Sequence, residues 1–250
     1  MKIKGIQVMT FFKYETDLPE GSGFALFSGT HLIGLVFVLI VGIILYRIYA
    51  SLTDHKRIQM ERLLAISIVM LDCINDGILI AIGHFELCYL PLHLCGMAQF
   101  IILIHAITRR EYWGDILYAL FLPGALGALL FPDWSAYPII SFMSFHDFIN
   151  HGLLILYPML LIKGRHIHPS INSIWKPVVF LAVTVPIIYY INSIFDTNFF
   201  FLKIPAPDSP LSFILSITGK SFYLFGFACL MLLVMCVMYV PFIIRNYYKK

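Results

Sequence analysis

The chain has 250 residues, of which 60% are hydrophobic and only 12% are charged, and its formal net charge is +3. A soluble domain carries about 25% charged residues, so this composition excludes a water-soluble globular protein and favours a chain embedded in a lipid bilayer. The sequence has no basic stripe interleaved with aromatic residues, which excludes nucleic acid as a partner. Its five cysteines form no C-x-x-C pair, which argues against a zinc ribbon.

Seven apolar segments are long enough to cross the hydrocarbon core, which takes roughly 20 residues of helix. In chain order they cover about 28–49, 62–83, 87–108, 113–131, 138–162, 177–195 and 221–244. We therefore expect an all-α polytopic membrane protein, built as a single seven-helix transmembrane domain over residues 1–250. Because 196–220 contains Pro205, Pro207 and Pro210, we expect this stretch to be a non-helical loop.

The distribution of Lys and Arg predicts the orientation, because cytoplasmic loops carry an excess of basic residues. The loops after the first, third and fifth segments and the C-terminal tail share one side of the membrane and hold 12 of the 17 basic residues. We therefore expect the N-terminus outside and the C-terminus in the cytoplasm. The 12 residues are Arg47, Lys56, Arg57, Arg62, Arg109, Arg110, Lys163, Arg165, Lys176, Arg245, Lys249 and Lys250.

Polar and ionisable residues gather in the outer half of the predicted bundle. Such groups are costly inside a membrane and usually functional, so they predict a polar cavity open to the outside or to the outer leaflet. We expect the inner half of the bundle to contain no ionisable residues except His105 and Asp115. The outer residues are His31, Asp72, Asp76, His93, Cys95, Gln99, His146, Asp147, Asn150, His151 and Asn192.

Helical spacing narrows the roles within this set. Residues four apart share a helix face, so Asp147 and His151 look the same way. His93 is about 200° around an ideal helix from Cys95 and is a poor base for it. His151 on another helix fits better as the base, with Asp147 to orient it, which would make a thiol, imidazole and carboxylate set. The alternative to a catalytic role is that Cys95 serves only as a small buried hydrophobic residue.

Three other interpretations compete with this one. A metal-dependent lipid hydrolase could take ligands from His93, His146, His151, Asp72 and Asp76, although the last segment lacks the histidine pair usual in such enzymes. A non-catalytic lipid or small-molecule carrier is another candidate, although the chain shows no internal repeat. The polar groups could also serve only as hydrogen bonds between helices.

The run Leu90–Cys95 (LPLHLC) and the stretch Phe148–Gly152 (FINHG) resemble the bacterial YwaF-type integral membrane proteins, which are related to the eukaryotic transmembrane protein 164 family. The resemblance covers nearly the whole chain and continues through Phe27–His31, through the Gly-rich fourth segment up to Asp133, and from Asn192 to Leu211. Asn150 replaces a usual Ser and Phe200 a usual Tyr, which would change hydrogen bonding in the cavity.

The eukaryotic relatives move a fatty acyl chain from a phospholipid to a lysophospholipid through a membrane-embedded cysteine. The resemblance therefore implies Cys95 as nucleophile and His151 as its base, in a bacterial plasma membrane. We expect no cofactor and no metal, because the acyl donor is itself an ester. The residues expected to bind the phospholipid and lysophospholipid substrates are His93, Asp72, Asp76, His146, Asn150, Asn192, Asn198, Gln99 and His31.

Overall fold

The structure is a computed structural model that describes residues 11–248. Within this range all regular elements are helical and seven of them are long and apolar enough to cross a membrane, which confirms the predicted fold class. The seven spans are built from α2 (Gly29–Ser51), α3 (Asp54–Ala81), α4 (Leu94–Thr108), α5 (Glu111–Ile116), the π-helical η3 (Leu117–Phe121), α6 (Leu122–Leu130), α7 (Phe142–Lys163), α8 (Trp175–Phe195) and α9 (Pro210–Tyr247), with α5, η3 and α6 together forming the fourth span. Short 3-10 turns lie at η1 (Glu15–Asp17), η2 (Leu87–Tyr89), η4 (Ile171–Ser173) and η5 (Phe199–Phe201).

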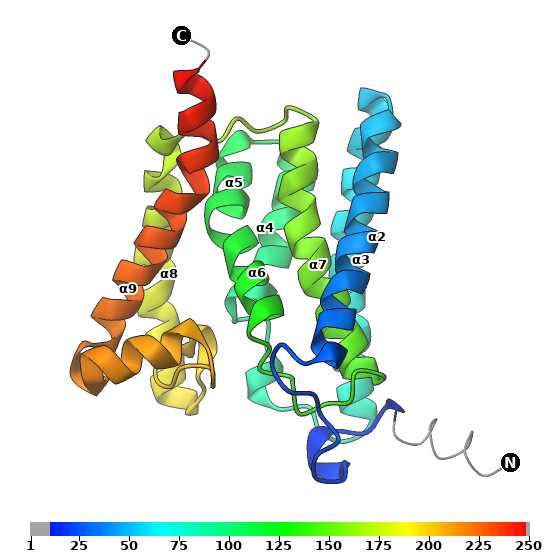
Figure 1. The fold of residues 1–250 in the computed structure, drawn as a ribbon, viewed down its shortest axis with the longest axis vertical. Helices are drawn as coiled ribbons and strands as arrows, with labels where there is room; N and C mark the ends of the chain where they lie inside the picture. The colour runs from blue at the N-terminus through cyan, green and yellow to red at the C-terminus, as the bar shows by residue number, and fades with distance from the viewer. Residues whose placement is uncertain (1–10, 249–250) are drawn as a thin grey trace, which may run out of the picture.

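Helix α7 is the centre of the bundle and packs against α2, α3, α4 and α6. Helices α8 and α9 stand to one side of this group (Figure 1), where α8 packs against α5, and α9 packs against η3 and α6. They are joined to it through η3, where the Tyr118 hydroxyl donates to the Met238 carbonyl, and through an ion pair between Lys176 and Asp115. At the opposite end, Phe199 and Leu202 pack on residues of the third span.

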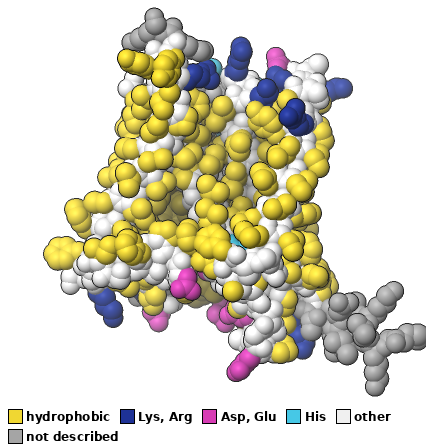
Figure 2. All heavy atoms as spheres, in the orientation of Figure 1, with side chains coloured by type: hydrophobic (Ala, Val, Ile, Leu, Met, Phe, Trp, Pro, Cys, Tyr) yellow, Lys and Arg dark blue, Asp and Glu magenta, His cyan; other side chains and the backbone are white. Residues whose placement is uncertain are grey.

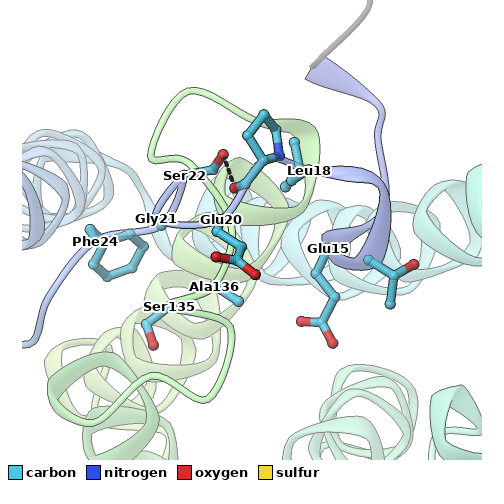
Figure 3. Close-up of a pocket in the computed structure, with 11 residues that line it drawn as sticks. Glu15, Leu18, Glu20, Gly21, Ser22, Phe24, Ser135 and Ala136 are labelled. Atoms are coloured by element: carbon cyan, nitrogen blue, oxygen red, sulfur yellow. Dashed lines mark hydrogen bonds between the residues drawn. The ribbon is translucent and has the colours of Figure 1, made fainter.

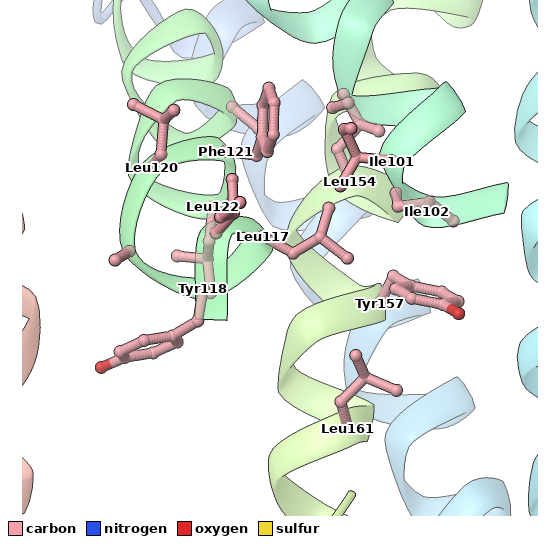
Figure 4. Close-up of a cluster of buried hydrophobic side chains, with 14 of the residues drawn as sticks. Ile101, Ile102, Leu117, Tyr118, Leu120, Phe121, Leu122, Leu154, Tyr157 and Leu161 are labelled. Atoms are coloured by element: carbon pink, nitrogen blue, oxygen red, sulfur yellow. The ribbon is translucent and has the colours of Figure 1, made fainter. Parts of the chain in front are cut away.

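The fourth span forms the middle of the core. Every residue of the π-helical segment Leu117–Phe121 is buried. Figure 4 shows Leu117 directed toward Leu154 and Tyr157 of α7, whereas Tyr118 points to the other side of its helix. A helix that is apolar all round is buried on all sides, so this short span can be enclosed by its neighbours.

Lateral surfaces are apolar, while charged side chains lie mainly at the two ends (Figure 2). Lys and Arg gather at the end that carries the C-terminus, and Asp and Glu are prominent at the opposite end. We call these the inner end and the outer end, after the orientation that the basic residues predict.

Two expectations about local structure are wrong. The stretch 196–220 is not a loop throughout, because α9 begins at Pro210 and bends at Gly219, where φ is +67°. Proline is tolerated at the first position of a helix, and the Ser209 side chain caps this helix by accepting from Leu211 N. The third span is not one helix either, since α4 begins only at Leu94 after the η2 turn.

The inner half also contains a buried polar cluster, which corrects a third expectation. Glu61 on α3 is completely buried. Its carboxylate accepts hydrogen bonds from the Tyr49 hydroxyl at 2.5 Å and from the Arg109 guanidinium, and it lies 2.8 Å from His166 Nδ1. These residues sit at the ends of predicted spans, where the sequence suggests contact with water, but the fold turns them toward one another.

Candidate active site

An outer polar cluster is built where α3, α4 and α7 meet. Gln99 Nε2 on α4 donates to Asp72 Oδ2 on α3 at 2.5 Å. The other oxygen, Asp72 Oδ1, lies 3.4 Å from His146 Nε2, and His146 Nδ1 lies 3.1 Å from Asp147 Oδ1. The buried His146 ring therefore stands between two carboxylates, which keep 22% and 25% of their side-chain surface exposed. An imidazole in this position can carry the positive charge that both carboxylates favour.

His151 has one ring nitrogen occupied and one without a hydrogen bond among the described residues. Its Nδ1 lies 2.8 Å from the backbone carbonyl oxygen of Asp147. Because a carbonyl only accepts, Nδ1 carries the hydrogen, and in the neutral ring Nε2 keeps its lone pair. The Asp147 carboxylate contacts His146 rather than His151. The orienting group that we expected from the Asp147 side chain is thus supplied by its main chain.

Cys95 is the second residue of α4 and is half-buried. The carboxylate whose charge acts most strongly on its sulfur is Asp133, followed by Asp72 and Asp147. The charges of Asp72 and Asp147 also reach His151, so the thiol and the imidazole share the same electrostatic surroundings. Within the described chain no hydrogen bond joins Cys95 Sγ to His151, and an approach of their reacting atoms to about 5 Å stays a prediction.

His93 caps the start of α4 rather than standing on it. Its φ and ψ of −69° and 160° are extended, so the argument from ideal helical spacing between His93 and Cys95 does not apply. The ring packs against Phe199 and Phe201 of η5, with centroid distances of 5.2 and 5.4 Å. His93 therefore borders the segment that connects α8 with α9.

Three of the residues expected to bind substrate are engaged elsewhere. Both ring nitrogens of His31 meet backbone groups, with Nε2 2.9 Å from the Leu129 oxygen and Nδ1 accepting from Phe27 N at 3.0 Å. The Asn192 amide binds Thr197 and both backbone groups of Phe199. The Asn198 side chain binds backbone groups of residues 203 and 204. These contacts shape turns and leave few polar atoms for a ligand.

Several buried polar atoms near the cluster have no protein partner. Asn150 is 93% buried and its Oδ1 makes no hydrogen bond among the described residues. A buried polar group without a partner costs stability, so such groups mark places where a ligand contact is worth seeking. Asp76, one turn from Asp72, lies within reach of the charges of Asp72 and His146. The other atoms of this kind on the outer side are Asn75 Oδ1, Trp134 Nε1, Ser144 Oγ and His146 Nε2.

The connection between α6 and α7 contributes two residues that the sequence did not single out as site residues. Asp133 keeps exposed surface, yet the surrounding protein raises the pKa of its carboxyl to about 6, and the charge of Asp147 adds to this. Trp134 stacks on His151. The family resemblance in the sequence extends to Pro132 and Asp133 and could have pointed to Asp133. No sequence pattern pointed to Trp134.

An open recess lies beside this connection on the outer side. Figure 3 shows Glu15 and Glu20 near Ser135 and Ala136, with the recess lined mainly by residues 15–24. The charge of Glu15 reaches Asp133. The recess therefore lies next to the loop that supplies Asp133 to the outer cluster.

The described residues that were candidates for metal ligands do not come together in one site. Within residues 11–248, no three His, Cys, Asp or Glu side chains are grouped so that they could hold a metal ion. All five residues named for the hydrolase interpretation lie within this range; the His93 ring packs against Phe199 of η5, whereas His146 lies beside Asp72.

Comparison with known proteins identifies the family. A family model described as the TMEM164 family matches residues 26–239. No curated protein and no solved structure matches the chain. The matched range contains the whole outer polar cluster and covers most of the chain. The chain therefore belongs to the TMEM164 family.

Proposed function

We propose that this protein moves a fatty acyl chain from a phospholipid to a lysophospholipid in the outer half of the membrane, with Cys95 as nucleophile and His151 as base. The observation that carries the proposal is the His151 ring, whose Nδ1 is held by the Asp147 carbonyl so that Nε2 can accept a proton. Cys95 and His151 are within reach of the same two carboxylates. Family membership and the seven apolar helices support a lipid substrate.

The first half-reaction transfers the acyl group to sulfur. The thiol proton passes to His151 Nε2 as sulfur attacks the ester carbonyl. The tetrahedral intermediate then expels the glycerol oxygen, which takes the proton from His151 and leaves as a lysophospholipid. A thioester remains on Cys95.

The second half-reaction runs the same steps in reverse with a different alcohol. The hydroxyl of an acceptor lysophospholipid gives its proton to His151 Nε2 and attacks the thioester carbonyl. The C–S bond breaks, sulfur takes the proton back, and a new phospholipid leaves. Both donor and product are esters, so the exchange needs no cofactor.

The cluster around Asp72, Gln99 and His146 would bind the polar part of the lipid at the reacting ester. The exposed edges of Asp72 and Asp147 and the unpartnered Asn150 are the groups available for this. Access from the bilayer would suit the apolar lateral face of the molecule (Figure 2).

The test uses purified protein in phospholipid vesicles with an isotope-labelled donor and an unlabelled lysophospholipid. Cys95→Ser and His151→Ala are expected to lower transfer at least about 100-fold, because each removes a reacting group. Cys88→Ser is the control, since Cys88 is exposed and its nearest polar contact is a glutamate 3.9 Å away.

Full activity of Cys95→Ala would contradict the proposal and leave Cys95 as a small packing residue. Binding of lysophospholipid without turnover in the wild type would instead favour the carrier interpretation.

A further inference from the structure

Trp134 lies flat against the ring of the proposed base. The indole of Trp134 and the imidazole of His151 are stacked, with ring centroids 4.9 Å apart and planes 16° apart. Trp134 is 94% buried and His151 is 95% buried. The stack is therefore formed inside the protein and is not a contact between mobile surface side chains.

Two contacts fix the His151 ring in different ways. The hydrogen bond from Nδ1 to the Asp147 carbonyl fixes one atom of the ring, but it would still allow the plane to turn about that contact. The stacked indole removes this freedom because it sets the plane. Together they fix the direction of the Nε2 lone pair, which is the atom that takes and returns the proton.

The chain around Trp134 holds the indole in place. Phe24 N donates to the Ser135 carbonyl oxygen at 2.9 Å. The neighbouring Gly23 lies so close that a Cβ there would be 2.1 Å from the same oxygen. The edge of Trp134 also meets the ring of Phe148, with centroids 5.9 Å apart and planes at 86°. Residues 23–24 therefore hold in place the loop from which Trp134 stacks on His151.

We propose that Trp134 is a positioning residue that holds His151 in the orientation needed to exchange protons with Cys95. The inference rests on the proposed function for its catalytic meaning, while the stack itself can be tested without any activity. A positioning role predicts that an aromatic plane at 134 matters for turnover and matters little for substrate affinity.

The first experiment uses fluorescence. The sequence has three tryptophans, so Trp113→Phe with Trp175→Phe leaves Trp134 as the single indole. The imidazole stacked on this indole changes its surroundings, so at one fixed pH we expect the emission of Trp134 to differ between this background and His151→Gln in the same background. The charged groups nearby, Asp72, Asp133, His146 and Asp147, are the same in both proteins, so the difference isolates the contribution of His151. Identical emission spectra with and without His151 would overturn the stack.

The second experiment measures acyl transfer by Trp134→Phe and Trp134→Leu. We expect Trp134→Leu to lower kcat about 10-fold or more with KM changed less than about 3-fold, and Trp134→Phe to restore most of kcat because it retains a plane. Equal kcat for wild type and Trp134→Leu, or an effect confined to KM, would overturn the positioning role. If Trp134→Leu fails to fold, a Trp134→Phe variant with the kcat of a His151→Ala variant would overturn it as well.

The two experiments separate failure of the inference from failure of the proposed function. A wild-type protein without acyl transfer would reject the proposed function, while an emission spectrum of Trp134 that depends on His151 would still establish the stack. Acyl transfer that depends on Cys95 and His151 but not on the plane at 134 would reject the inference alone.

Discussion

Two buried polar clusters among the described residues differ in how completely their atoms are paired. At the inner end, both oxygens of the Glu61 carboxylate have partners, since Oε1 meets Tyr49 and His166 and Oε2 meets Arg109. In the outer cluster, the carboxylates keep exposed surface and Asn150 has a buried oxygen without a partner. A fully paired cluster stabilises the fold, whereas an incompletely paired one is typical of a site that meets a ligand.

The inner cluster also joins more of the chain. Tyr49 comes from α2, Glu61 from α3, Arg109 follows α4, and His166 follows α7. Nearby, His105 Nδ1 and the Tyr157 hydroxyl lie 3.0 Å apart between α4 and α7. This arrangement fastens the inner ends of four helices, while the outer ends leave room for the cluster around Asp72 and His146.

The largest effect on stability is expected from Glu61→Ala. Removing this carboxylate leaves the Arg109 guanidinium without its buried counter-ion, which should lower the free energy of unfolding by about 3–5 kcal/mol. The readout is the thermal unfolding midpoint in detergent.

The matched control for Glu61→Ala is Glu111→Ala, at the same end of the molecule. Glu111 is 49% exposed and contacts His168. An exposed pair of this kind contributes about 0–1 kcal/mol, so the midpoint should hardly move. Equal losses from both variants would show that the Glu61 cluster does not fasten the helices.

The next largest effect tests the contact between residues 23–24 and the loop that carries Trp134. A methyl group at Gly23 would meet the Ser135 carbonyl, and overpacking of this kind costs about 1–3 kcal/mol. We expect Gly23→Ala to lower both the unfolding midpoint and acyl transfer, because it displaces the loop that carries Trp134. Gly29→Ala is the control, since a Cβ there meets nothing within 4 Å. Activity retained by both variants would separate the loop from the site.

A pair of asparagines sharpens the comparison between paired and unpaired groups. Asn150→Leu removes an unpartnered oxygen, so the unfolding free energy should rise by about 0.5–1.5 kcal/mol while acyl transfer falls. Asn192→Leu removes an amide that binds Thr197 and Phe199, so it should destabilise the protein. Destabilisation by both to the same degree would remove the distinction drawn between the two asparagines.

The smallest effect concerns Asp133 and pH. Because its pKa in the folded protein is raised to about 6, above the value near 4 of an unfolded chain, the native state binds this proton more tightly. The contribution of Asp133 to stability is therefore fully present below about pH 4 and is lost as the pH rises through 6. Asp133→Asn should raise the unfolding midpoint at pH 7.5 relative to wild type and have less effect at pH 4.5. A difference independent of pH would contradict this.

The sequence predicted the seven helices because hydropathy depends only on local composition and length. It also placed Asp72, Gln99 and His146 in the outer half of the bundle, and the structure brings these three together. It could not predict the Glu61 cluster, because charged residues at span ends are as readily solvated as paired. It could not assign Asp147 to His146, because i and i+4 spacing allows Asp147 equally to face His151.

The boundaries that the sequence missed have local causes. Pro210 was taken as a break, but at the first position of a helix its missing N–H costs nothing. The extended backbone at His93 removes one turn from the third span, and no hydropathy pattern reports this. Likewise, the loop carrying Trp134 is set by the close approach of Gly23 to Ser135, a contact distant in sequence.

The most direct test of the account is to trap the acyl group on the enzyme. Purified protein would be incubated with phospholipid in the absence of any acceptor and then digested for mass spectrometry. The account predicts an acyl adduct on the peptide that contains Cys95, released by neutral hydroxylamine as a thioester should be and absent from Cys95→Ser and His151→Ala. Acyl transfer that proceeds with no adduct, or with an adduct on Cys88 only, would contradict the role of Cys95 as the nucleophile.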